Sequence, residues 1–313
     1  MNQPSRANAA ALVPDGSRTP GALGATIAAA RADRRAALVG YLPVGYPDVD
    51  TSIAAMRAIV AAGVDIVEVG VPYSDPGMDG PTIQAAVDPA VRAGVGMRDV
   101  LRAVTAVADA GAAAVVMTYW NPVEHYGVMR FAADLAGAGG SGAITPDLIP
   151  DEAAPWFAAS DAYGLDRVFL VAPSSTDARL ASTAAACRGF VYAASTMGVT
   201  GARDAVGTTA RTLVARVRAV SPESAVCVGL GVSNGRQAEE VAQFADGVIV
   251  GSALVRCLLD SPDATGIATV ARLTAELADG VRAYRRLDRS PSSAAGVSQL
   301  TSRTVVPPSD ERI

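Results

Sequence analysis

Eight short apolar runs rich in Val, Ile and Ala recur along the middle of the chain, and longer amphipathic segments separate them. This alternation is typical of repeated βαβ units, whose strands pair in parallel and whose helices cover the sheet. Aromatic residues make up only 5% of the 313 residues, which suits a close-packed parallel sheet better than a β-sandwich. The predicted strands are Ala37–Tyr41, Ile66–Gly70, Ala114–Thr118, Gly142–Thr145, Arg167–Ala172, Gly189–Ala193, Ala225–Gly229 and Gly247–Val250.

Helical periodicity follows the strands, and one further amphipathic stretch, Gly21–Ala32, precedes the first strand. A doubly wound open sheet is the alternative architecture, but it would place a GxGxxG after the first strand, where this chain has LPVGYPD. We therefore predict an α/β protein built as a (β/α)8 barrel, a TIM barrel, with an extra N-terminal helix. Among the predicted helices are Thr51–Ala62, Asp151–Tyr163, Asp204–Val220 and Gly235–Phe244.

The two ends of the chain differ from this pattern. Residues 1–18 and 289–313 are rich in Ser, Pro, Asn and Arg and show no periodicity, so we predict two disordered, flexible tails around a catalytic barrel of residues 19–288.

Charge and cysteine content limit the partners and the compartment. The net charge is −5 without a basic run, which argues against a nucleic-acid partner, and no stretch reaches the ~18 apolar residues of a membrane span. The three cysteines form no CxxC, as expected for reduced thiols. We therefore expect a cytoplasmic protein with a small-molecule partner.

The sequence contains no lysine, and His125 is its one histidine. A Schiff-base mechanism needs a lysine amine, and a catalytic zinc site normally uses two or three histidines. We therefore expect neither of these mechanisms, no metal and no cofactor. His125 itself is predicted to be a surface residue.

Glu68 interrupts the apolar second strand, DIVEVG. It is in phase with Ile66 and Gly70, so if Val67 and Val69 face the helices, Glu68 points into the barrel lumen. An unpaired charge there is costly, and one interpretation is a carboxylate paired with an arginine. The other is a general acid and base whose pKa burial raises toward neutrality.

Asp75 and Asp79 follow in the loop VPYSDPGMDGPTIQ, which leaves the same strand end and should lie over the lumen. Asp79 forms a candidate carboxylate pair with Glu68. Since Pro81 suits a first helical position, Asp79 could instead be the N-cap of the next helix.

Three successive loops at one end of the barrel are glycine-rich: STMGVTG (195–201), GLGVSNG (229–235) and GSAL (251–254). Glycine lets the backbone approach a ligand, and amide groups at the start of a helix bind phosphate without lysine. Gly251 and Ser252 would open such a helix. Tight turns alone could explain one such loop, but their coincidence predicts a phosphate site.

These motifs resemble the tryptophan synthase alpha chain family. VEVGVPYSDPGMDGPTIQ (67–84) looks like the family's signature around its catalytic glutamate and loop aspartate, and ASTMGVTG, GLGVS and GVIVGSAL follow in the family's order. The resemblance covers about residues 20–284 and implies a carbon–carbon lyase of tryptophan biosynthesis. That enzyme cleaves indole-3-glycerol phosphate to indole and glyceraldehyde 3-phosphate, and two alpha chains assemble with two beta chains.

The resemblance also assigns roles to individual residues. Glu68 matches the acid and base, Asp79 the carboxylate that engages the indole N–H, and Tyr192 the tyrosine that faces the active site. The matching phosphate-binding positions are Gly201, Gly231, Gly251 and Ser252, and the residues near the pocket and the mobile loops are Tyr41, Asn121 and Thr200.

The chemistry of the residues agrees with this reaction. A retro-aldol cleavage needs an electron sink, and indole can supply its own once its ring carbon is protonated; loss of the side-chain hydroxyl proton then breaks the carbon–carbon bond. Glu68 would exchange both protons while Asp79 stabilises the N–H that becomes positive.

The chain departs from better-known members at Gly77 and Met78 in the aspartate loop, at Thr196, where some carry arginine, and in DLIPDEA (147–153). The first two changes put loop closure in question, and none touches the proposed chemical groups.

Other readings stay open at this point. The indole-glycerol-phosphate synthase barrel needs a lysine, and phosphoribosylanthranilate isomerase uses a strand-end cysteine that no residue here supplies. A regulatory subunit with little activity of its own is a further alternative, although Glu68 and Asp79 argue against it. A lyase without a partner is another, because the predicted loop NPVEHYG (121–127) could be an interface or ordinary surface.

Overall fold

The computed structural model describes residues 21–194, 203–229 and 231–283, so the two predicted tails lie outside the described residues. All paired strands of its sheet are parallel, in the order β5-β4-β3-β2-β1-β9-β8-β7-β6. Phe169 alone separates β5 from β6, so the two ends of this order are consecutive in the chain and the sheet closes into a barrel. The predicted (β/α)8 fold is confirmed.

The strands match the predicted runs to within two residues at their ends, except that the fifth predicted strand is divided in two. Their bounds are β1 Ala37–Pro43, β2 Ile66–Gly70, β3 Ala113–Met117, β4 Gly142–Ile144, β5 Asp166–Val168, β6 Leu170–Val171, β7 Val191–Ala194, β8 Val226–Gly229 and β9 Gly247–Val250.

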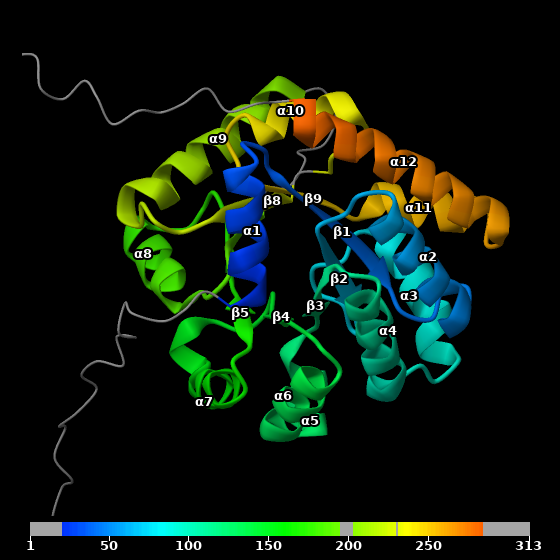
Figure 1. Ribbon diagram of the computed structural model, residues 1–313. Coiled ribbons are helices and arrows are strands. Elements are labelled where there is room, and N and C mark those ends of the chain that lie inside the picture. The colour runs from blue at the N-terminus through cyan, green and yellow to red at the C-terminus, as the bar shows by residue number, and fades with distance from the viewer. Residues whose placement is uncertain (1–20, 195–202, 230, 284–313) are drawn as a thin grey trace, which may run out of the picture.

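Helices surround the barrel on its outside (Figure 1). Side-chain caps begin three of them: Asp48 accepts a hydrogen bond from the amide of Thr51, and Thr176 and Asn234 do the same for α8 and α10. The bounds are α1 Ala22–Ala32, α2 Val49–Ala61, α3 Pro81–Arg92, α4 Met97–Asp109, α5 Trp120–Tyr126, α6 Val128–Gly137, α7 Ala154–Ala162, α8 Asp177–Ala186, α9 Arg203–Val220, α10 Gly235–Ala242, α11 Ser252–Asp260 and α12 Ala264–Ala283.

Two predictions about local structure were wrong. The segment 121–127, predicted as a loop, belongs to helix α5, because Pro122 sits in the first turn, where its missing amide costs nothing, and Gly127 ends the helix. The predicted helix Asp151–Tyr163 is instead a 3-10 turn, Pro150–Glu152, followed by α7.

The core has two parts, as the strand alternation requires. Outward-facing residues such as Val67 and Val69 pack against the helices. Inward-facing residues such as Val39, Ile66 and Ile249 fill the lumen in a separate cluster. The inward and outward faces of β2 are therefore those that the sequence predicts.

Helix α1 lies across the N-terminal end of the barrel (Figure 1), and its Leu23, Ile27 and Ala30 join the lumen cluster. Buried aspartates hold both of its ends. At its start, the amide of Leu23 donates to Asp166 at 2.9 Å. At its end, Arg31 forms an ion pair with Asp246 at 2.9 Å. The predicted extra helix therefore closes the barrel floor.

No helix in the described ranges is both long enough and apolar enough to cross a membrane.

Candidate active site

Glu68 lies inside the barrel near the C-terminal end of β2, on the face it shares with Ile66, and only 1% of it is exposed. No described arginine pairs with it, and its Oε1 has no hydrogen-bond partner among the described residues. Burial raises the pKa of Glu68 from 4.5 to about 8. The structure therefore disfavours the arginine-paired interpretation and leaves a carboxyl that can hold a proton near neutral pH.

Two tyrosines flank this carboxyl. Tyr41 stands opposite Glu68 in the register of β1 and β2, and Tyr192 on β7 packs against the lumen cluster. Burial raises the pKa of both phenols well above the usual range, and the nearby charge of Glu68 raises each further. Both tyrosines therefore remain protonated beside Glu68 and can donate hydrogen bonds.

Each tyrosine ring crosses the glycine that ends the next strand. A Cβ on Gly70 would lie 2.6 Å from the hydroxyl oxygen of Tyr41, and a Cβ on Gly229 would lie 2.7 Å from that of Tyr192. Side chains larger than hydrogen at these glycines would displace the rings. The strand-end glycines thus make room for the aromatic wall around Glu68.

Asp79 lies in the loop between β2 and α3, and its carboxylate Oδ1 accepts a hydrogen bond of 3.1 Å from the hydroxyl of Tyr119. Burial raises the pKa of Asp79, and this hydrogen bond partly offsets the rise. The N-cap of α3 is Gly80 and shows no side-chain cap, so the alternative that Asp79 caps the helix is wrong.

Tyr41 connects the two carboxylates. After burial, the charges of Asp79 and Glu68 are the largest causes that raise its pKa, which places the phenol near both groups. Asp75, by contrast, is exposed, and the hydroxyl of Ser74 donates to its carboxylate at 2.6 Å. Of the two loop aspartates, Asp79 is thus the one brought to the lumen mouth.

The predicted phosphate-binding residues are only partly described. Gly251 is the N-cap of α11 and Ser252 its first residue, as predicted, and a Cβ on Gly251 would lie 3.5 Å from Tyr41. Gly231 follows β8 with φ of +68°, a conformation that favours glycine. Gly201 and Thr200 lie outside the described residues, as does Thr196.

Asn121 lies near the start of α5 and is exposed, and its Nδ2 donates to the hydroxyl of Tyr73 at 3.2 Å. The Tyr73 ring lies 5.3 Å from that of Tyr119. Asn121 therefore reaches the site only through these two aromatic residues. His125, in the same helix, is exposed.

Tyr119 is the residue of this site that the sequence analysis missed. It follows β3 by two residues, at the same end of the barrel as Glu68, and only 8% of it is exposed. Its position directly after a barrel strand was the available signal, because side chains there reach the lumen mouth.

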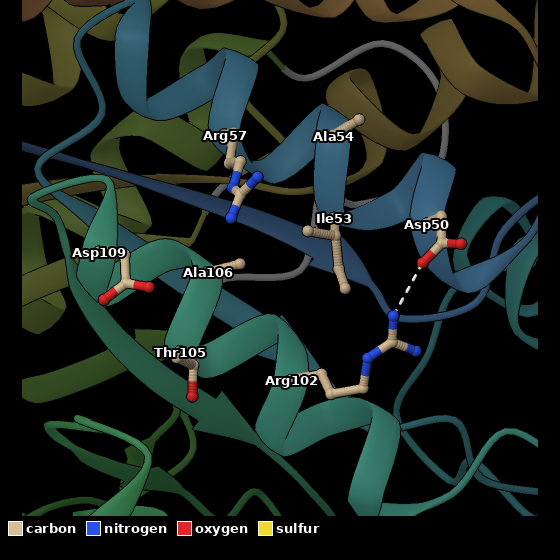
Figure 2. Close-up of a pocket in the computed structure, with 8 residues that line it drawn as sticks. All are labelled: Asp50, Ile53, Ala54, Arg57, Arg102, Thr105, Ala106 and Asp109. Carbon is tan, nitrogen blue, oxygen red and sulfur yellow. Dashed lines mark hydrogen bonds and ion pairs between the residues drawn. The ribbon is translucent and has the colours of Figure 1, made fainter.

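A groove of about 630 Å³ lies elsewhere, between α2 and α4 on the outside of the barrel (Figure 2). The Arg102 guanidinium pairs with Asp50 across it at 2.9 Å. None of the predicted site residues lines this groove, so it is separate from the strand-end site.

Comparison with known proteins agrees with this geometry. The family model of the tryptophan synthase alpha chain matches residues 27–282. The alpha chain of Thermobifida fusca is 64% identical over 263 residues, which cover 83% of this chain and 97% of that protein. The alpha chain of Mycobacterium marinum is 65% identical over 260 residues, 83% of this chain and 94% of the relative.

A solved structure of Mycobacterium tuberculosis tryptophan synthase has 61% identity and a TM-score of 0.78, and the match covers 84% of this chain and 99% of that one. Sequence motifs, barrel topology and relatives thus agree, and this chain belongs to the tryptophan synthase alpha chain family.

Proposed function

We propose that this chain cleaves indole-3-glycerol phosphate to indole and glyceraldehyde 3-phosphate, as the alpha chain of tryptophan synthase in tryptophan biosynthesis. The observation that carries the proposal is Glu68, a carboxyl in the apolar lumen whose pKa burial raises to about 8. Such a group holds a proton near neutral pH and can both give and take one within a single turnover.

The reaction begins with a proton that Glu68 gives to the indole ring carbon bearing the glycerol phosphate chain. The ring becomes an indolenine, and its positively charged nitrogen is the electron sink that replaces the lysine this chain lacks. Glu68 then removes the proton of the hydroxyl next to that carbon. The hydroxyl oxygen forms the aldehyde, the carbon–carbon bond breaks, and its electron pair restores the aromatic indole.

Asp79 accepts the indole N–H and stabilises the positive charge that develops there. The tyrosines Tyr41 and Tyr192 line the cavity around the ring, and Asn121 and Thr200 belong to its outer edge. Backbone amides at Gly201, Gly231, Gly251 and Ser252 hold the phosphate. The N-terminus of α11 supports this assignment, because its first amides have no acceptor within the helix and favour an anion.

The partner of the chain is the tryptophan synthase beta chain, which receives the indole in an assembly of two alpha and two beta chains. The relatives carry the name alpha chain, and the match in Mycobacterium tuberculosis is a chain of tryptophan synthase. We place the enzyme in the cytoplasm, which the free state of Cys187, Cys227 and Cys257 supports.

A steady-state assay of the purified chain tests this proposal. Glyceraldehyde 3-phosphate formed from indole-3-glycerol phosphate is measured with the chain alone and with the beta chain added, and light scattering of the mixture reports the complex. Cleavage by the chain alone supports an enzyme in its own right. Absence of cleavage in both samples contradicts the proposed reaction, and a mixture that stays as separate chains contradicts the partner.

A further inference from the structure

The hydroxyl of Tyr119 bridges two neighbouring residues of the loop between β2 and α3. The amide of Met78 donates to its oxygen at 2.9 Å, and the hydroxyl lies 3.1 Å from Oδ1 of Asp79. On the other side of the loop, Nε2 of Gln84 donates to the main-chain oxygen of Asp79 at 2.8 Å. Asp79 is therefore held from β3 through its side chain and from α3 through its backbone.

The direction of these hydrogen bonds is determined by the groups themselves. A backbone amide can only donate, so the Tyr119 oxygen accepts from Met78, and its single proton is left for Asp79. Burial raises the pKa of Tyr119 to about 12, so the phenol keeps this proton at neutral pH. Oδ1 of Asp79 is thus occupied, while Oδ2 makes no hydrogen bond within the described residues.

Tyr119 is itself firmly placed. It is 8% exposed, and its ring lies 5.3 Å from the ring of Tyr73, whose hydroxyl accepts from Nδ2 of Asn121. A tyrosine that is packed in this way loses little further side-chain freedom when a ligand binds. It can therefore hold the otherwise half-exposed Asp79 in one orientation before the substrate arrives.

We infer that Tyr119 is a positioning residue, which fixes the loop aspartate through Oδ1 and so presents Oδ2 to the ligand. The inference rests on the function proposed above for Asp79 and goes beyond it, since Tyr119 acts on the reaction only through that carboxylate. Tyr119 does not exchange a proton with the substrate.

Tyr119→Phe is the direct test, because it removes the hydroxyl and keeps the ring against Tyr73. Turnover of indole-3-glycerol phosphate falls at least about 10-fold, the scale of a hydrogen bond to a charged group, with a smaller change in KM. Amide hydrogen exchange in residues 74–80 becomes faster, because the amide of Met78 loses its acceptor. The matched control is Tyr126→Phe, which removes a tyrosine–aspartate hydrogen bond of 2.6 Å, to Asp134, outside the site.

The pH profile gives a readout that a merely structural role would not change. The hydrogen bond from Tyr119 lowers the pKa of Asp79. Its removal raises that pKa, so the acid limb of kcat/KM moves to higher pH in Tyr119→Phe and stays in place in Tyr126→Phe. In the described part of the chain, the titratable groups that face Asp79 are Tyr119 and Tyr41, and the pKa values of both phenols are raised.

Asp79→Asn, alone and combined with Tyr119→Phe, separates this inference from the proposed function, with single-turnover measurements to detect residual activity. If Tyr119 acts through Asp79, its substitution changes the rate less than about 2-fold in the Asp79→Asn background. An equal loss in both backgrounds overturns the inference alone, as does a Tyr119→Phe variant that matches Tyr126→Phe. An Asp79→Asn variant with full turnover overturns both the inference and the role proposed for Asp79.

Discussion

Tyr41 and Glu68 stand directly opposite each other on β1 and β2, and both belong to the inward-facing sets of their strands. A phenol beside a buried carboxyl can donate to the carboxylate that remains after Glu68 has given up its proton. This arrangement stabilises the ionised form only at the stage of the reaction where it exists, because no charge is present when Glu68 is protonated.

Replacement of Glu68 by Gln keeps the shape of the protonated side chain and removes its proton transfer. We expect unchanged folding and unchanged binding of a phosphate-containing substrate analogue, but a fall in turnover of about 100-fold or more. Release of glyceraldehyde 3-phosphate measures the loss, and circular dichroism checks the fold. A variant within a few-fold of the wild-type rate would contradict the catalytic role.

The raised pKa of Glu68 also predicts how stability depends on pH. Between pH 4.5 and about 8 the folded chain keeps a proton that the unfolded chain has lost, so the free energy of unfolding falls as the pH rises. The slope from this group is on the order of 1 kcal/mol per pH unit, and it levels off above pH 8. Urea titrations of wild type and Glu68→Gln across this range measure it. Identical slopes for the two proteins would show that Glu68 ionises normally.

Asp79→Asn removes the charge that faces the indole N–H and preserves the size of the side chain. Turnover should fall about 100-fold with the fold intact, because the stabilising charge acts only when the ring nitrogen becomes positive. Asp88→Asn is the control, since Asp88 is exposed on the following helix, α3. Equal activities of the two variants in the steady-state assay would remove Asp79 from the mechanism.

Gly70→Ala should displace the phenol of Tyr41, since the added Cβ would lie 2.6 Å from its hydroxyl oxygen. We expect kcat/KM to fall between about 10-fold and 100-fold through misplacement of the groups around Glu68. Gly137→Ala adds the same methyl group at the end of α6, where nothing lies within 4 Å, and should have no effect on activity. A Gly70→Ala variant as active as this control would mean that the exact place of the Tyr41 ring is unimportant.

Asp246→Ala should destabilise the fold by about 2 to 4 kcal/mol. Burial opposes ionisation of Asp246, but Arg31, the amide of Val226 and Arg218 outweigh it and hold its pKa well below the usual range. The contribution of Asp246 is therefore present above the ordinary carboxyl pKa and is lost as the pH falls toward the folded value. Thermal unfolding at neutral pH measures the change.

The control is Asp50→Ala, whose exposed ion pair with Arg102 is worth less than about 1 kcal/mol. Similar melting temperatures for the two variants would show that Asp246 does not fasten α1.

Strand periodicity was enough to predict the barrel and the direction of Glu68, because a period of two assigns every residue of β2 to one face. The contacts of Asp79 could not be predicted in this way. They depend on Tyr119, 40 positions along the chain, and the loop between β2 and α3 has no periodicity that would indicate its path. Helix α5 was missed because Pro122 and Gly127 are also turn residues, and only the surrounding packing distinguishes a short helix from a turn.

The floor that α1 forms makes the barrel a vessel with a single opening. Leu23, Ile27 and Ala30 are at most 1% exposed, so no route leads from Glu68 out through the N-terminal end. Substrate and both products must therefore share one doorway, the rim of loops after the strands. Release of indole is then a matter of timing among these loops, and a receiving chain has to wait on that same side.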